Sequence, residues 1–313
     1  MGEEGEYSMT IATGRLRAAA RYLYKHRSAY LFISPFFIGF AVFGLYPMFY
    51  SIYLSFMQYN FKAPSVWVGL GNYQDIVRDP TFWISLKNTL ILWLGTLPFQ
   101  LLLAFIIASV INAFIGQRWK GVLSGLYYLP TVTNLVAVAL VFQLIFDNQY
   151  GIMNFFLKLV GAPTIPWLIS EGWARVSTIL LITWRGTGWY VVFILAALQS
   201  IDKEYYEVAM IDGATTVQKA WYITLPILRP IFLYLVVMGT IAGWQIFTEP
   251  YLLMRGVSNV MGGPGQAVLT PAMLVYDKAF VSLKFGYASA VSTLLGVVIA
   301  FFSVLYFRFF KEK

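Results

Sequence analysis

The side chains that usually carry chemistry are scarce in this sequence. It has no cysteine and one histidine, His26, which lies in a basic run. Disulfides, iron–sulfur clusters and thiolate metal sites are therefore excluded, and no metal site is expected. Neither G-x-x-x-x-G-K-[ST] nor G-x-G-x-x-G occurs, so no nucleotide phosphate site is expected either. Since no acid/base, nucleophile or metal set is visible, we predict that the chain is not an enzyme and binds no cofactor itself.

The most distinctive polar feature is a charged stretch, EYYEVAMIDGATTVQKAWYITLP, at Glu204–Pro226. Asp202 is expected to cap a short helix that begins here, because its carboxylate can accept a backbone N–H of the first turn. Gly213 is expected to end that helix, because glycine adopts the left-handed conformation readily. A second short helix follows, capped by Thr215 or Thr216.

Leu225-Pro226 is expected to stop the second helix before the next apolar segment. Two uses of this helix–turn–helix remain open. It is either an amphipathic linker that rests among lipid headgroups, or an elbow over Ala209 to Ala214 that inserts into a groove of another protein.

A second group of polar residues interrupts the apolar segments themselves. Amides and carboxylates can hydrogen-bond to sugar hydroxyls, and aromatic rings can cover the apolar C–H face of a sugar. On this basis the candidate substrate-pathway residues are Arg185, Trp244, Gln245, Glu249 and Asn134. The alternatives are a structural hydrogen bond or a snorkelling side chain for Arg185, and interfacial anchoring for the tryptophan.

The elements that position these residues are helices in a membrane. The chain is 59% apolar and 12% charged, with a mean hydropathy of +0.69, whereas soluble domains carry about 25% charged residues. A span needs about 20 apolar residues. Six segments qualify: Ala29–Phe56, Asn88–Ile115, Gly121–Phe146, Val176–Ser200, Ile231–Thr248 and Phe285–Phe307.

Lysine and arginine positions predict the orientation. With a cytoplasmic N-terminus, thirteen of them fall inside and eight outside, as expected from the positive-inside rule. The predicted organisation is a basic N-terminal segment (1–28), a six-helix domain (29–310) with the charged loop at 202–226, and a tail (311–313). Both termini and the loop are then cytoplasmic. The net charge is +8. The basic residues at the ends of the apolar spans are expected to contact anionic lipid headgroups rather than nucleic acid.

One outer segment also has helical periodicity. Apolar residues recur at spacings of four and three, at Leu269, Met273, Tyr276, Phe280, Leu283 and Tyr287. This pattern predicts a helix that lies on the outer surface and runs into the last span.

Composition and spacing alone leave several membrane functions open. A secondary transporter or channel that needs no ATPase would favour ionisable residues in several spans or an internal repeat, and only Arg185 and Glu249 are seen. An integral membrane enzyme would need a convergent catalytic set, which is absent. The third class is the membrane subunit of an ATP-driven importer.

Several motifs favour this third class. The pattern E-x-A-x3-G-x9-I-x-L-P, from Glu207 to Pro226, resembles the signature loop of ATP-binding-cassette (ABC) importer permeases, with Val208 in place of the usual second alanine. The resemblance to the carbohydrate-importing, maltose-type group extends over roughly residues 30–310. Its further motifs are VGLGNY, DPTFW, LKNT, LAALQSIDKEYYEVAMIDGA, ITLPILRP, GGPG and FGYASA.

The resemblance implies the type I ABC importer permease fold, an all-α membrane protein of six transmembrane helices with a cytoplasmic coupling helix. It implies that Glu207 is a polar anchor to a separate ATPase subunit, that Ala209 and Gly213 permit close approach, and that Asp212 supports the turn or contacts the partner. ATP hydrolysis, with ATP and Mg, would occur in that ATPase.

The resemblance also implies the remaining partners. These are a cytoplasmic ABC ATPase dimer, a second and different permease subunit, an extracytoplasmic solute-binding protein, a sugar substrate and membrane lipid. The expected location is the inner or plasma membrane of the cell.

Overall fold

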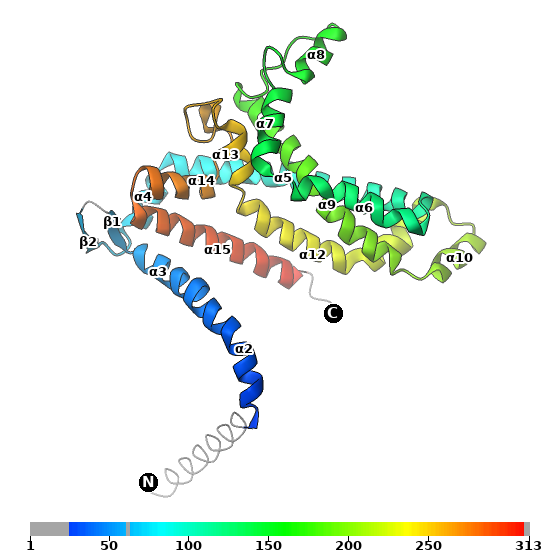
Figure 1. Ribbon diagram of the computed structural model, residues 1–313, viewed down its shortest axis with the longest axis horizontal. Helices are drawn as coiled ribbons and strands as arrows, with labels where there is room; N and C mark the ends of the chain where they lie inside the picture. Colours follow the sequence, from blue (N-terminus) through cyan, green and yellow to red (C-terminus); the bar gives the residue numbers. More distant parts are fainter. Residues whose placement is uncertain (1–24, 61–62, 310–313) are drawn as a thin grey trace, which may run out of the picture. The chain divides into compact units, whose positions relative to one another are not determined.

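A computed structural model describes residues 25–60 and 63–309 of the chain (Figure 1). The chain divides into a unit of residues 1–53 and a unit of residues 54–313. Apart from residues 25–28, the predicted N-terminal segment lies outside the described residues, as does the predicted tail at 311–313.

The first unit is a long apolar helix. Helix α2 (Arg27–Phe40), the π-helical turn η1 (Ala41–Leu45) and α3 (Tyr46–Leu54) follow one another without a break. This 28-residue helix coincides with the first predicted span, and none of its residues is buried. A helix that is apolar all round is suited to a membrane.

The second unit contains the remaining elements. In chain order they are β1 (Met57–Asn60), β2 (Ala63–Trp67), α4 (Gly71–Arg78), α5 (Pro80–Phe114), α6 (Gln117–Val132), α7 (Leu135–Ile145), α8 (Ile152–Leu159), α9 (Glu171–Gln199), α10 (Lys203–Ile211), α11 (Thr216–Lys219), η2 (Ala220–Thr224), α12 (Leu225–Trp244), α13 (Thr248–Met254), η3 (Pro264–Gln266), α14 (Pro271–Tyr276), η4 (Asp277–Val281) and α15 (Phe285–Phe309).

The helices agree with the predicted membrane architecture. The described residues contain five helices long and apolar enough to cross a bilayer, or six if the bent pair α6 and α7 counts as one span. Helix α5 begins earlier than predicted, at Pro80, because the Asp79 carboxylate caps it by accepting the backbone N–H of Thr81 at 2.8 Å. The antiparallel hairpin β1–β2 was not predicted.

The third span is not the continuous helix that was predicted for Gly121–Phe146. Helices α6 and α7 meet at a bend of 88°. Two residues account for the break: Pro130 lacks an N–H in the last turn of α6, and Asn134 caps the new helix by accepting the backbone N–H groups of Val136 and Ala137.

The predicted stop at Leu225-Pro226 is wrong. A continuous helix runs from Thr216 to Trp244, through α11, the π-helical turn η2 and α12. Pro226 lies in the first turn of α12, directly after the wider turn of η2, where its missing N–H breaks no regular ladder. The fifth span also ends earlier than predicted, at Trp244 rather than Thr248.

The predicted helix before the last span is present as α14 and η4, but it differs from the prediction in two respects. Met273 and Leu274 of α14 are fully buried, so this helix packs into the protein. The helix then stops after η4, where Leu283 has a left-handed φ of 55°, and α15 begins separately at Phe285.

Most of the membrane core lies between α5 and α9. Ala104 and Ala108 of α5 are fully buried against Val191 and Ile194 of α9. Helix α6 also approaches α9 closely, since a Cβ on Gly188 would collide with the carbonyl oxygen of Tyr127. Small residues allow helix backbones to approach in this way within membranes.

Candidate functional site

The charged loop folds as a helix, a tight turn and a second helix. As predicted, Asp202 caps α10 by accepting the N–H of Glu204 at 3.1 Å. The helix ends at Gly213, whose φ is 73°. The N–H of Gly213 donates to the Met210 carbonyl at 3.1 Å and that of Ala214 to the Ala209 carbonyl at 2.9 Å. These two bonds form a Schellman motif, which needs the left-handed residue that glycine supplies.

The second helix of the loop is capped at its start, and the first helix is hydrogen-bonded to the helix that continues into the fifth span. Thr215 accepts the N–H of Gln218 while the Gln218 side chain accepts the N–H of Thr215, which forms a capping box. The hydroxyls of Tyr206 and Thr224 lie 2.9 Å apart. Tyr206 therefore connects α10 to the long helix that begins at Thr216.

The exposed surface of this loop carries several apolar side chains. No residue of α10 is buried, and Ile211 is 86% exposed. Val208, Met210, Val217, Trp221 and Tyr222 are also exposed. Glu207 and Asp212 are exposed among them, whereas Ala209 is half-buried. A surface of this composition can bind an apolar groove on another protein.

A second site lies in the membrane domain, where Arg185 joins two broken spans. Its Nη1 donates to Oε1 of Glu249 at 3.0 Å, in the first turn of α13. Its Nη2 donates to the carbonyl of Thr131 at 3.2 Å, in the last turn of α6. The Thr131 hydroxyl in turn donates to the Arg185 carbonyl at 2.9 Å. Arg185 thus contacts the chain beside both helix breaks.

Arg185 and Glu249 line a cavity of about 350 Å³, which we call the central cavity. Gln245 and Glu249 enter it from the break between α12 and α13, and Gln100 from α5. Trp189 and Tyr190 of α9 add aromatic surface. Irregular backbone at membrane depth is tolerated where it lines a cavity, and interrupted spans are typical of substrate sites in transporters.

The structure brings together only part of the predicted substrate-pathway set. Arg185, Gln245 and Glu249 share the central cavity. Trp244 does not line it: its ring is 5% exposed and stacks on Phe302 of α15 at 5.3 Å. Asn134 lies at a separate apolar cavity, where its side chain caps α7.

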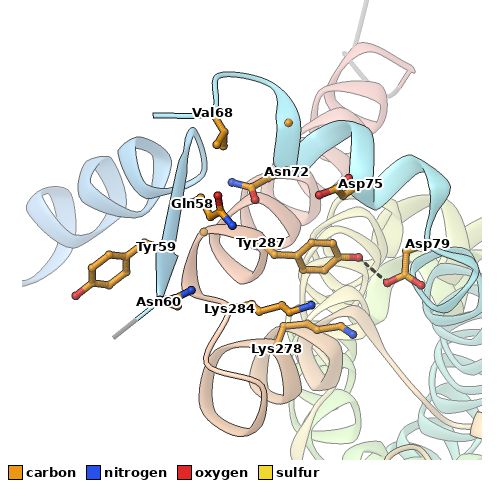
Figure 2. Close-up of a pocket in the computed structure, with 12 residues that line it drawn as sticks. Gln58, Tyr59, Asn60, Val68, Asn72, Asp75, Asp79, Lys278, Lys284 and Tyr287 are labelled. Carbon is orange, nitrogen blue, oxygen red and sulfur yellow. Dashed lines mark hydrogen bonds between the residues drawn. The ribbon is translucent and has the colours of Figure 1, made fainter. Parts of the chain in front are cut away.

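Residues from β1, α4, η4 and α15 line a polar cavity of about 450 Å³. The labelled elements β1, α4 and α15 meet at the opposite end of the second unit from α10 (Figure 1). Figure 2 shows the lining of this cavity, in which the Tyr287 hydroxyl donates to Oδ2 of Asp79 at 2.7 Å. Burial raises the pKa of Asp79, but hydrogen bonds from Tyr287 and Thr81 lower it by more, so the pKa lies below its ordinary value of 3.8.

Sequence reasoning did not identify this polar cavity, although the motifs that line it were visible. Asn72 from VGLGNY donates to the carbonyls of Ser55 and Met57, at 2.8 and 2.9 Å. Gly286 from FGYASA packs so closely that a Cβ would collide with the Met57 carbonyl. These motifs therefore join the hairpin, α4 and α15 around the cavity.

The LKNT motif is hydrogen-bonded to the turn that follows GGPG. Asn88 donates to the carbonyls of Gln266 and Leu269, at 2.7 and 3.2 Å. Arg175 of α9 donates to the carbonyl of Ala267 at 3.1 Å. The turn after GGPG is thereby fixed to α5 and α9, beside the expected outer ends of these helices.

No group of three or more histidine and acidic residues within the described ranges could hold a metal ion. Here the polar groups instead form hydrogen-bonding surfaces for a ligand or a partner.

Comparison with known proteins agrees with this architecture. A family model described as "binding-protein-dependent transport system inner membrane component" matches residues 100–311. The lactose transport system permease protein LacF of Rhizobium radiobacter is 34% identical over 91% of this chain and 95% of its own length. The arabinooligosaccharides transport system permease protein AraP of Bacillus subtilis (strain 168) is 32% identical, over 90% and 88% of the two chains.

The fold is also found among solved structures. A chain of a bacterial alginate ABC transporter, in complex with an alginate pentasaccharide-bound periplasmic protein, superposes with a TM-score of 0.74 at 23% identity. The match covers 91% of this chain and 94% of that one. By sequence, by fold and by its interrupted membrane helices, the chain belongs to the family of binding-protein-dependent transport system inner membrane components, the permease subunits of ABC importers.

Proposed function

We propose that this permease imports a sugar or oligosaccharide and forms one half of the translocation pathway. The relatives named for lactose and arabinooligosaccharides support this cargo class. The other half would be a second, different permease subunit. A solute-binding protein would deliver the cargo from outside the cell.

The observation that carries the mechanism is the exposed loop at 202–226. Its apolar surface, with Ile211 86% exposed, suits insertion into a cleft of a cytoplasmic ATPase dimer that holds ATP and Mg. Glu207 and Asp212 would supply polar contacts beside this surface. Ala209 and Gly213 would keep the elbow compact, since they form the Schellman turn. This arrangement requires both termini to be cytoplasmic.

Movement of the ATPase would reach the central cavity in two steps. Tyr206 and Thr224 link α10 to the helix that continues into the fifth span. That span ends at the cavity lined by Gln245 and Glu249. A tilt of this helix would therefore alter the central cavity, where Arg185, Gln245 and Glu249 would meet the sugar.

The first test is the ATPase activity of the complex in nanodiscs, with and without its binding protein and a panel of sugars. We expect a sugar-loaded binding protein to stimulate hydrolysis in the wild type, and Gly213→Asp to lose that stimulation or the ATPase subunit. Gly161→Asp is a matched control, because Gly161 also has a positive φ, 74°, with no atom near its Cβ position. Both variants introduce the same backbone strain, and only one lies in the loop.

Two results would contradict the proposal. Normal coupling in Gly213→Asp would leave the loop as an interfacial linker. Sugar uptake without any ATPase subunit would instead favour a secondary transporter or channel.

A further inference from the structure

Six aromatic side chains form a continuous row in the second unit. Neighbouring ring centroids lie 5.1–6.2 Å apart. In spatial order the row consists of Phe247, Tyr251, Tyr276, Phe280, Phe285 and Tyr59. We call this set the aromatic row. It draws on four separate parts of the chain, so no single helical periodicity could have predicted it.

The aromatic row connects two cavities. At one end, Phe247 lines the central cavity together with Arg185 and Glu249. At the other end, Tyr59 lines the outer polar cavity, where Figure 2 shows it on β1. The row therefore runs from the expected outer face to the break in the fifth span.

The rings of the row do not belong to the buried cores of the described chain. Phe280 is 66% exposed, and the other five side chains are half-buried. Each ring thus keeps surface that another molecule can contact.

Two backbone irregularities hold the middle of the row in place. The π-helical turn η4 keeps Phe280 beside Tyr276, with centroids 5.4 Å apart. The chain then reverses at Leu283, where the N–H of Lys284 donates to the Lys278 carbonyl at 2.7 Å. This reversal brings Phe285 to Phe280. Single π-turns inside helices often mark functional positions.

The outer polar cavity offers both hydrogen-bond acceptors and hydrogen-bond donors. Asp75 and Asp79 present carboxylates, and Lys278 and Lys284 present ammonium groups (Figure 2). No ion pair forms among these four described side chains. Hydroxyl groups can donate to such carboxylates and accept from such ammonium groups at the same time.

A sugar chain fits these observations. A pyranose ring has an apolar C–H face that stacks on an aromatic ring, and hydroxyl groups at its edge. We propose that the aromatic row is a guide along which a linear oligosaccharide passes from the outer polar cavity to the central cavity. The ring spacing is comparable with the length of one sugar unit, so a chain of several units would contact several rings at once. This inference rests on the proposed function of sugar import.

The test is uptake by the complete transporter, with its partner permease, ATPase and binding protein, in proteoliposomes. The probes are lactose and the arabino-, malto- and xylo-oligosaccharides of two to five units. We expect Phe280→Ala and Tyr276→Ala to raise KM about fivefold for sugars of three or more units, the size of one ring-stacking contact. The KM for disaccharides, which span fewer rings, should change by less than about twofold.

Two controls separate the row from general damage. Tyr276→Phe keeps the ring and should restore the wild-type KM. Tyr150→Ala removes a tyrosine that is 89% exposed and outside the row, and should change nothing. In Tyr150→Ala, stimulation of ATP hydrolysis by the loaded binding protein should also stay at the wild-type level.

Three outcomes would overturn the inference. One is an unchanged KM in both alanine variants, and a second is an equal loss for every chain length. The third is a weakened affinity for the binding protein with unchanged length dependence, which would make the row a protein interface. A wild-type complex that transports no probe would instead overturn the proposed function, and the inference with it.

Discussion

Arg185 and Glu249 form an ion pair of 3.0 Å that joins α9 to the start of α13. Their side chains are 26% and 18% exposed, and both line the central cavity. Because Arg185 also bonds to the Thr131 carbonyl, one guanidinium holds the two interrupted spans together. The pair also makes the cavity electrically neutral, since its charges are opposite and adjacent.

We expect Arg185→Gln or Glu249→Gln to destabilise the complex more than the double variant does. Removal of one partner leaves an uncompensated charge, at a cost of about 3–5 kcal/mol when fully buried. Partial exposure should reduce this to about 2 kcal/mol. Thermal inactivation of the four forms in nanodiscs gives the coupling energy. A double variant whose effect equals the sum of the two single effects would show that the pair does not stabilise the domain.

Helix α6 approaches α9 too closely for a side chain at Gly188. We expect Gly188→Ala to lower assembly or stability by about 1–3 kcal/mol, because its Cβ would collide with the Tyr127 carbonyl. Gly125→Ala in α6 is the control, since no atom lies within 4 Å of its Cβ position. The yield and thermal stability of the purified complex distinguish the two. Equal behaviour of the variants would contradict this tight crossing.

The sequence predicted best where the determinants are local. The caps at Asp202 and Thr215 and the stop at Gly213 depend on neighbouring residues, and the structure has all three. The predicted stop at Pro226 failed because a π-turn directly before it, which no local pattern indicated, accommodates the proline within a continuous helix.

Long-range relationships were less accessible. Arg185 was visible as a charge in an apolar segment, but its contact with Glu249 depends on the break in the fifth span. Asn134 was predicted as a substrate contact, and the structure shows it as a helix cap. The polar cavity beside Asp79 and Tyr287 was missed because its residues come mainly from β1, α4, η4 and α15, and nothing in their spacing indicates that these elements meet.

The capping role of Asn134 can be separated from a role in substrate binding. Asn134→Ala should destabilise the α6–α7 bend by about 1 kcal/mol, because the N–H groups of Val136 and Ala137 lose their acceptor. Asn134→Asp and Asn134→Ser retain a cap and should keep wild-type stability and uptake. Thermal inactivation and sugar uptake measure the two effects. A loss of uptake in the serine variant at unchanged stability would indicate that the amide itself contacts the cargo.

The Asp79–Tyr287 hydrogen bond predicts a specific acid sensitivity. The pKa of Asp79 lies below 3.8 in the folded protein, because the bonds from Tyr287 and Thr81 outweigh the opposing effect of burial. A carboxylate with a lowered pKa stabilises the fold fully above its unfolded-state pKa. That stability is lost as the pH falls from about 4 through the folded-state pKa. Over this range the free energy of unfolding of the wild type should therefore fall by about 1 kcal/mol more than that of Asp79→Asn.

Thermal inactivation of the complex from pH 7 to pH 3 gives the difference between the two profiles, so that other carboxylates cancel. Tyr287→Phe is the matched control. It removes the 2.7 Å hydrogen bond but keeps the ring and the Thr81 contact. Its acid sensitivity should therefore lie between those of the wild type and Asp79→Asn. Parallel profiles for the wild type and Asp79→Asn would mean that Asp79 does not stabilise the junction between α4 and α15 through its charge.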